Sequence, residues 1–143
     1  MSVYFDASVL LPTLIKEPAS AAVDAYVLTA EQEFLVSDFA AAEVASGLSR
    51  LVRMGRLEAA AAVAQLDDFE VWRAAASSPV EVHAADVRLA YVYVRRFELL
   101  LRAPDALHLA IARRLDAGLV TLDRRLERAA RQLGIAVEVP QTK

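Results

Sequence analysis

The sequence predicts an α/β fold in which helices wrap a mainly parallel sheet, built as one domain over residues 1–143. Short β-prone apolar runs alternate with stretches of helical periodicity, the pattern typical of parallel sheets with helical crossovers. The chain has 143 residues, of which 57% are hydrophobic, enough to fill the core of one ordinary domain. It contains only four glycines and no linker-like stretch that would divide it.

The first part of the chain reads as alternating strands and helices, followed by a helical hairpin. The expected elements are a strand over residues 1–5, helices over 7–16 and 19–29, and a strand over 33–37. Ser37 or Asp38 can cap the next helix, because a side-chain oxygen there accepts a hydrogen bond from a free amide. That helix, residues 39–54, ends before Gly55, and an Ala-rich helix over 57–69 completes a protruding hairpin.

The second part of the chain returns twice to the sheet. The expected elements are an extended segment starting at 69–72, a loop or short strand at 80–82, helices over 84–97 and 106–116, a strand over 119–122, a helix up to 133 and a strand over 135–139. Pro104 suits a helix N-terminus, where its missing N–H is not needed. Asp123 is the expected cap of the last helix, and Gly118 and Gly134 stand where two helices should end.

The composition excludes several kinds of site. With no cysteine, the chain has no disulfide, no Cys-ligated zinc, no iron–sulfur cluster and no thiol nucleophile. His83 and His108 are the only histidines, which excludes a multi-His metal site. A net charge of −3 means that contact with nucleic acid must be local or metal-mediated. No apolar run approaches the length of a membrane span, so we expect a soluble, cytoplasmic protein.

Four acidic residues are expected at one edge of the sheet. Asp6 and Asp123 directly follow two predicted strands, Glu43 lies about one turn into the helix after the second strand, and Asp105 adjoins Pro104 at a helix start. Side chains that follow the carboxyl ends of parallel strands converge in one crevice. The sequence therefore predicts a cluster of carboxylates there.

Converging carboxylates either raise one another's pKa values or recruit a cation. Oxygen ligands without His or Cys select Mg²⁺ or Mn²⁺, and such a site suits hydrolysis of phosphodiesters. The alternatives are structural: Asp105 and Asp123 could simply cap helices, and Glu43 could lie on a solvated face. Asp6 is harder to explain in that way, because a charge beside a buried strand is costly without a partner.

Four ordered segments span nearly the whole chain: Tyr-Phe-Asp-Ala-Ser at 4–8, Ala-Glu-Val at 42–44, Pro-Asp-Ala-Leu-His-Leu-Ala at 104–110 and Val-Thr-Leu-Asp at 120–123. On these segments the chain resembles the PIN-domain ribonucleases, and more narrowly the VapC-type toxins of bacterial toxin–antitoxin pairs. The resemblance implies a three-layer α/β/α sandwich with a central, mainly parallel sheet. It also implies a metal-dependent endoribonuclease that acts as a toxin.

The resemblance assigns the catalytic residues as Asp6, Ser8, Glu43, Asp105, Thr121 and Asp123. Asp6 and Asp105 would be the main ligands of Mg²⁺ (or Mn²⁺), and the other two acids would complete the site directly or through water. Ser8 and Thr121 would orient carboxylates or the attacking water. Helix capping by Ser8 and ordinary strand packing by Thr121 are the structural alternatives.

The resemblance further implies an RNA substrate, a homodimer and a small antitoxin whose C-terminal segment lies across the active-site groove. We expect antitoxin contact at the helical hairpin of residues 39–69. His108, three residues after Asp105, should pack or hydrogen-bond near the site. Arg124, Arg128 and Arg131 share a helical face beside Asp123; they could hold RNA phosphates or be solvated surface.

Two other functions remain as alternatives. The acidic pocket could belong to a non-catalytic regulatory module that receives basic side chains of a partner. Asp6 could instead be the nucleophile of a phosphoryl-transfer enzyme, but such enzymes need a nearby cation, and Lys16 and Lys143 are the only lysines. Such enzymes also often carry a second aspartate where this chain has Ser8.

Overall fold

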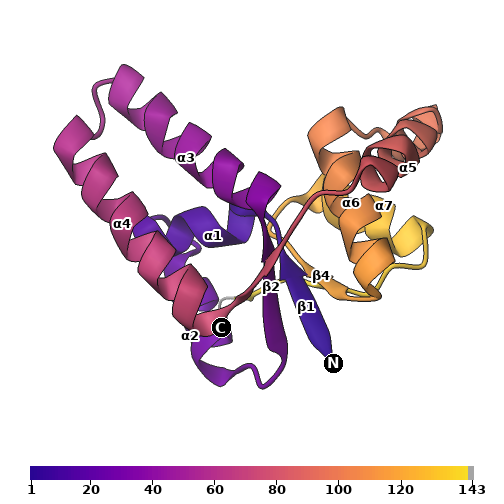
Figure 1. The fold of residues 1–143 in the computed structure, drawn as a ribbon, viewed down its shortest axis with the longest axis horizontal. Coiled ribbons are helices and arrows are strands. Elements are labelled where there is room, and N and C mark those ends of the chain that lie inside the picture. The colour runs from indigo at the N-terminus through magenta and orange to yellow at the C-terminus, as the bar shows by residue number, and fades with distance from the viewer. Residues whose placement is uncertain (142–143) are drawn as a thin grey trace.

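The computed structural model describes residues 1–141 and contains a five-stranded, fully parallel sheet (Figure 1). The strands are β1 (Ser2–Phe5), β2 (Glu33–Ser37), β3 (Ser78–Val80), β4 (Gly118–Val120) and β5 (Val137–Glu138). Their order across the sheet is β3-β2-β1-β4-β5. The chain thus starts in the centre of the sheet and adds strands on both sides, which places the end of β1 beside the ends of β2 and β4.

Helices cover both faces of the sheet. They are α1 (Ala7–Leu14), α2 (Ser20–Thr29), α3 (Asp38–Arg53), α4 (Ala59–Ala76), α5 (Ala84–Val94), α6 (Ala103–Leu115) and α7 (Arg124–Gln132), with a 3₁₀ turn at Phe97–Leu99. Helices α1 to α4 lie on one face and α5 to α7 on the other (Figure 1). The predicted three-layer sandwich is confirmed, with the α3–α4 hairpin projecting from it.

Alternation along the central strands divides the core into two halves. Val3 and Phe5 of β1 pack with the α1–α4 layer, whereas Tyr4 between them packs with the α5–α7 layer. Successive side chains of a strand point to opposite faces, so a strand covered on both faces is apolar throughout. Both caps suggested by the sequence form: Ser37 Oγ accepts from the Ala40 amide at 2.9 Å, and Asp123 caps α7.

The hairpin is longer than the sequence suggested. Residues 69–72 are not extended, because α4 continues without a break to Ala76. Phe69 and Trp72 lie three residues apart on one side of that helix and stack with ring centroids 6.2 Å apart. The short apolar run therefore follows helical rather than strand periodicity.

Two helix ends also differ from the prediction. Helix α6 starts at Ala103 and ends before Asp116, which adopts a left-handed conformation with φ 50°. Asp116 therefore takes the terminating role expected of Gly118, which instead begins β4 against Val3. Gly134 does end α7, with φ +73°, as expected. None of the helices in the described part of the chain combines the length and hydrophobicity that a membrane span requires.

Candidate functional site

Asp6 directly follows the central strand β1, and its side chain is only 4% exposed. Two hydroxyl groups hold the carboxylate from opposite sides: Ser8 Oγ donates to Oδ1 at 2.6 Å, and Thr121 Oγ1 donates to Oδ2 at 2.7 Å. Ser8 comes from α1, and Thr121 follows β4, the strand paired with β1. The arrangement fixes both oxygens of a buried acid at the carboxyl edge of the sheet.

Backbone amides in turn hold the two hydroxyl groups. The Leu122 amide donates to Ser8 Oγ at 2.9 Å, and the Asp123 amide donates to Thr121 Oγ1 at 3.0 Å. Each hydroxyl therefore accepts one hydrogen bond and donates its own proton to Asp6. The expected orienting role of Ser8 and Thr121 toward a carboxylate is consistent with this geometry.

Burial raises the pKa of Asp6, and the hydrogen bonds from Ser8 and Thr121 offset only part of that effect. A carboxylate removed from water is stabilised in its charged form by hydrogen bonds or by a nearby cation. Asp6 accepts these hydrogen bonds, but no arginine or lysine among residues 1–141 pairs with it. A divalent cation would complete the compensation that this acid lacks.

Glu43 belongs to a second, buried chain of hydrogen bonds. From α3 it accepts a hydrogen bond from His108 Nε2, and Tyr4 Oη lies 2.6 Å from His108 Nδ1 and 2.8 Å from Ser37 Oγ. Tyr4, Ser37 and His108 are at most 3% exposed. Burial raises the pKa of Tyr4, so the phenol keeps its proton. Because the Glu43 carboxylate can only accept, Nε2 of His108 carries the proton that faces it, and Nδ1 of a neutral ring accepts from the Tyr4 hydroxyl.

Asp105 and Asp123 both make local hydrogen bonds at helix starts. Asp105 Oδ2 accepts from the Arg102 amide at 3.3 Å and lies 3.8 Å from Arg102 Nε. Asp123 Oδ1 accepts from the amides of Arg125 and Leu126 at 2.9 and 3.2 Å, which caps α7. Both carboxylates therefore bond to backbone amides at a helix start, as the capping alternative expected. Each still has lone pairs that could bind a cation.

Hydrogen bonds link the predicted residues in two groups. The Thr121 hydroxyl links Asp6 to the backbone amide of Asp123, and Glu43 is hydrogen-bonded to His108, one turn after Asp105 on α6. Among residues 1–141, no three His, Asp or Glu side chains form an arrangement that could hold a metal ion. The donor types nevertheless suit Mg²⁺ or Mn²⁺, since they are carboxylate and hydroxyl oxygens. Ligation by the four acids therefore stays a prediction.

Tyr4 and Ser37 support the site through hydrogen bonds that the sequence does not indicate. Tyr4 lies within a buried strand, and the hydrophobic pattern of that strand does not show that the tyrosine hydroxyl has a role. Its hydroxyl reaches His108 across 104 positions of sequence. The one available signal was that a buried tyrosine needs a hydrogen-bond partner for its hydroxyl.

Replacing Tyr4 with Phe should destabilise the fold by about 1–3 kcal/mol, because Ser37 and His108 would lose a buried partner. Urea denaturation followed by circular dichroism measures the change. Tyr91→Phe is the matched control, since Tyr91 on α5 is 65% exposed and should tolerate the change. Equal unfolding midpoints for both variants would show that the buried chain adds nothing to stability.

Comparisons with known proteins agree with this architecture. The PIN domain family model matches residues 3–132. Ribonuclease VapC46 of Mycobacterium tuberculosis is 32% identical over 142 residues, covering 97% of this chain and 98% of the relative.

Solved structures share the fold at low sequence identity. VapC20 of Mycobacterium tuberculosis, described as a toxin that cleaves the sarcin-ricin loop, has a TM-score of 0.73 at 18% identity and covers 89% of this chain and 94% of its own. VapBC2 of Rickettsia felis, bound to a DNA fragment from its promoter, has a TM-score of 0.70 at 17% identity and covers 97% and 98%. From the family model and the curated relative together, the chain belongs to the PIN-domain family and, within it, to the VapC-type ribonucleases.

Proposed function

We propose that this chain is the ribonuclease toxin of a toxin–antitoxin pair and that it cleaves RNA phosphodiester bonds with Mg²⁺ or Mn²⁺. The observation that carries the proposal is the buried Asp6 carboxylate, held by two hydroxyls at the carboxyl edge of a parallel sheet. The chain matches the PIN domain family and is 32% identical to a curated ribonuclease, which supports a role for this acid in cleaving RNA.

Asp6 and Asp105 would be the main metal ligands, with Glu43 and Asp123 completing the site. Bound there, the cation would polarise a phosphoryl oxygen, lower the pKa of a water molecule and stabilise the leaving oxygen. The hydroxyls of Ser8 and Thr121 restrict Asp6 to one orientation, and each of its oxygens retains a second lone pair. His108 restrains Glu43 in the same way through Nε2–H.

Metal removal tests the proposed function. Purified protein should cleave a labelled RNA with Mn²⁺ or Mg²⁺, lose cleavage in excess EDTA and recover it when Mn²⁺ is restored, because the carboxylates alone supply no electrophile. The products are resolved on a denaturing gel. Full cleavage in EDTA would contradict the metal mechanism, and no cleavage with either cation would contradict the nuclease.

The second candidate is a non-catalytic module whose acidic pocket receives a basic partner segment. It is favoured by one observation: among residues 1–141, no three His, Asp or Glu side chains form a group that could hold a metal ion. RNA that stays intact with Mn²⁺, together with tight binding of a basic antitoxin peptide, would support this function instead.

The proposal includes an antitoxin partner, because related structures are of VapB–VapC complexes. An apolar pocket of about 490 Å³ lies where α1 and α2 meet α4, on the hairpin side of the molecule. Its apolar lining includes Leu14, Val27, Phe69 and Trp72. We propose this surface, within and beside the expected hairpin, as the place where the antitoxin packs. A homodimer, a cytoplasmic location and a single domain remain predictions.

A further inference from the structure

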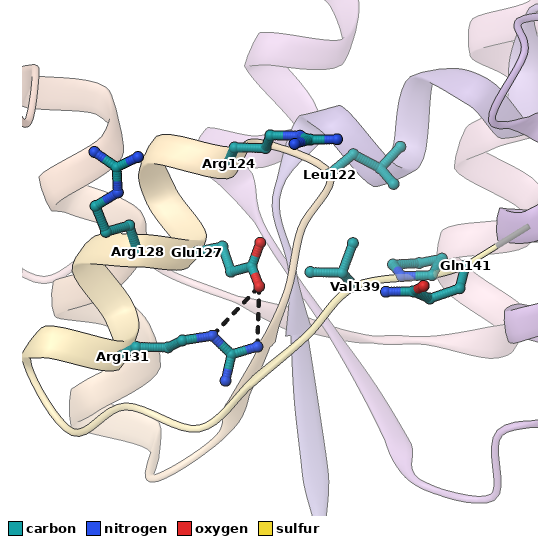
Figure 2. A pocket seen from close by; sticks show the side chains of 8 residues that line it. Leu122, Arg124, Glu127, Arg128, Arg131, Val139 and Gln141 are labelled. Atoms are coloured by element: carbon teal, nitrogen blue, oxygen red, sulfur yellow. Dashed lines mark hydrogen bonds and ion pairs between the residues drawn. The ribbon is translucent and has the colours of Figure 1, made fainter.

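A pocket of about 620 Å³ lies between α7 and the chain that leaves β5. Figure 2 shows its lining, with arginines from α7 on one side and Leu122, Val139 and Gln141 on the other. Pro140 completes the apolar part of the wall. The pocket therefore combines a cationic side with an apolar side.

The cationic side of the pocket has three arginines, Arg124, Arg128 and Arg131, but only one acidic residue, Glu127. Arg131 pairs with Glu127, at 2.9 Å from Nη2 to Oε2 (Figure 2). Arg124 and Arg128 are exposed and have no ion-pair partner within residues 1–141. Two guanidinium groups thus stay free in a chain whose net charge is −3.

The pocket borders the candidate active site at Leu122. Leu122 lines the pocket, and its amide donates to Ser8 Oγ, the hydroxyl that holds Asp6. Arg124 directly follows Asp123 and extends toward Leu122 (Figure 2). A polymer that approaches Asp6 from this side would lie beside Arg124.

We propose that Arg124 and Arg128 bind backbone phosphates of single-stranded RNA next to the cleaved bond, while the wall of Leu122, Val139 and Pro140 receives the flanking nucleoside. Guanidinium groups match phosphate oxygens in pairs, and single strands present both phosphates and apolar base faces. The two arginines stand one helical turn apart, about 6 Å along the axis. Both arginines lie on the helix that Asp123 begins, so a strand bound to them would lie beside the candidate site.

The inference rests on the proposed nuclease, and RNA binding without cleavage tests it separately. Fluorescence anisotropy of a labelled single-stranded RNA is measured in EDTA over a range of salt concentrations, for the whole chain and for an Arg124→Ala/Arg128→Ala variant. Each lost phosphate contact should lower the slope of log Kd against log salt by about 0.7. We expect a slope reduced by about 1.4 and an affinity about tenfold weaker at low salt.

Arg56→Ala is the matched control, because Arg56 is exposed at the tip of the α3–α4 hairpin and should leave the slope unchanged. Arg124→Lys should keep most of the slope, because the charge remains, while weakening the affinity. An unchanged slope in the double variant would overturn the inference. Unchanged RNA binding with weakened binding of an acidic peptide would also overturn it, and would assign the pocket to a protein.

The Mn²⁺ cleavage assay separates the two proposals. Arginine-dependent RNA binding by a protein that never cleaves RNA supports the pocket and contradicts the nuclease. Normal cleavage, together with a salt dependence of RNA binding that does not change in the Arg124→Ala/Arg128→Ala variant, supports the nuclease and contradicts the pocket.

Discussion

Asp6→Asn should lower RNA cleavage in Mn²⁺ by about a thousandfold or more. Asparagine has nearly the volume of aspartate and fits the same buried position, but its amide nitrogen cannot bind a cation. The Ser8 and Thr121 hydroxyls now both donate to the carboxylate, so one of them would face an N–H donor instead. Initial rates on a labelled RNA, compared with wild type at the same Mn²⁺ concentration, measure the loss.

Asp24→Asn is the control for removing one negative charge, because Asp24 is exposed on α2 and should leave the rate unchanged. A thermal shift gives a readout independent of catalysis. Mn²⁺ should raise the Tm of the wild type, since a ligand that binds only the folded state stabilises it, and should not raise that of Asp6→Asn. Wild-type rates in the asparagine variant would remove Asp6 from the mechanism.

Asp86→Ala should cause the largest loss of stability, about 3 kcal/mol, or a fall in Tm of about 10 °C. Asp86 on α5 is 2% exposed and accepts from Arg114 Nε at 2.8 Å, from Arg114 Nη2 at 3.0 Å and from the His83 amide at 2.8 Å. Its removal leaves the Arg114 guanidinium without its charge partner between α5 and α6. That group is 26% exposed, so water limits the cost. Thermal unfolding measures it.

The stability that Asp86 provides should depend on pH. Burial raises the pKa of Asp86, but the hydrogen bonds from Arg114 and from the His83 amide outweigh burial and hold it below its usual value. A carboxyl group whose pKa is lowered by folding stabilises the protein above its unfolded pKa, and this contribution disappears as the pH falls through the folded value. The difference in unfolding free energy between wild type and Asp86→Asn should therefore shrink below about pH 4.

Arg96→Ala is the control for losing an ion pair that is exposed rather than buried. Arg96 pairs with Glu98 at 3.0 Å, with both side chains at least 50% exposed, and solvent screens such pairs strongly. We expect no measurable change in Tm. An Asp86→Ala variant as stable as Arg96→Ala would show that the buried pair between α5 and α6 is not a stabilising contact.

Local sequence signals predicted the fold well because they act over a few residues. The caps at Ser37 and Asp123 and the strand over residues 33–37 follow from side-chain type and hydrophobic pattern alone. The left-handed turn at Asp116 was missed, because glycine two positions later was the stronger local signal.

The site could be predicted only in part. Strand order places the acids at one edge of the sheet, but the direction of each carboxylate depends on donors that come from distant elements. The hydrogen bond between Glu43 and His108 joins residues 65 positions apart in the sequence, and the one between Thr121 and Asp6 joins residues 115 positions apart. No periodicity encodes such pairs, so the sequence can place the acids at one edge of the sheet but cannot show which donors hold each of them.

Asp123 both belongs to the candidate site and starts the helix that carries the arginines. Losing it would cost the helix its N-terminal cap, worth about 1 kcal/mol, whether or not the protein still cut RNA. Selection for a well-folded chain would therefore preserve this aspartate even in a lineage that had abandoned catalysis. Its presence in a descendant would therefore be a poor marker of an active enzyme.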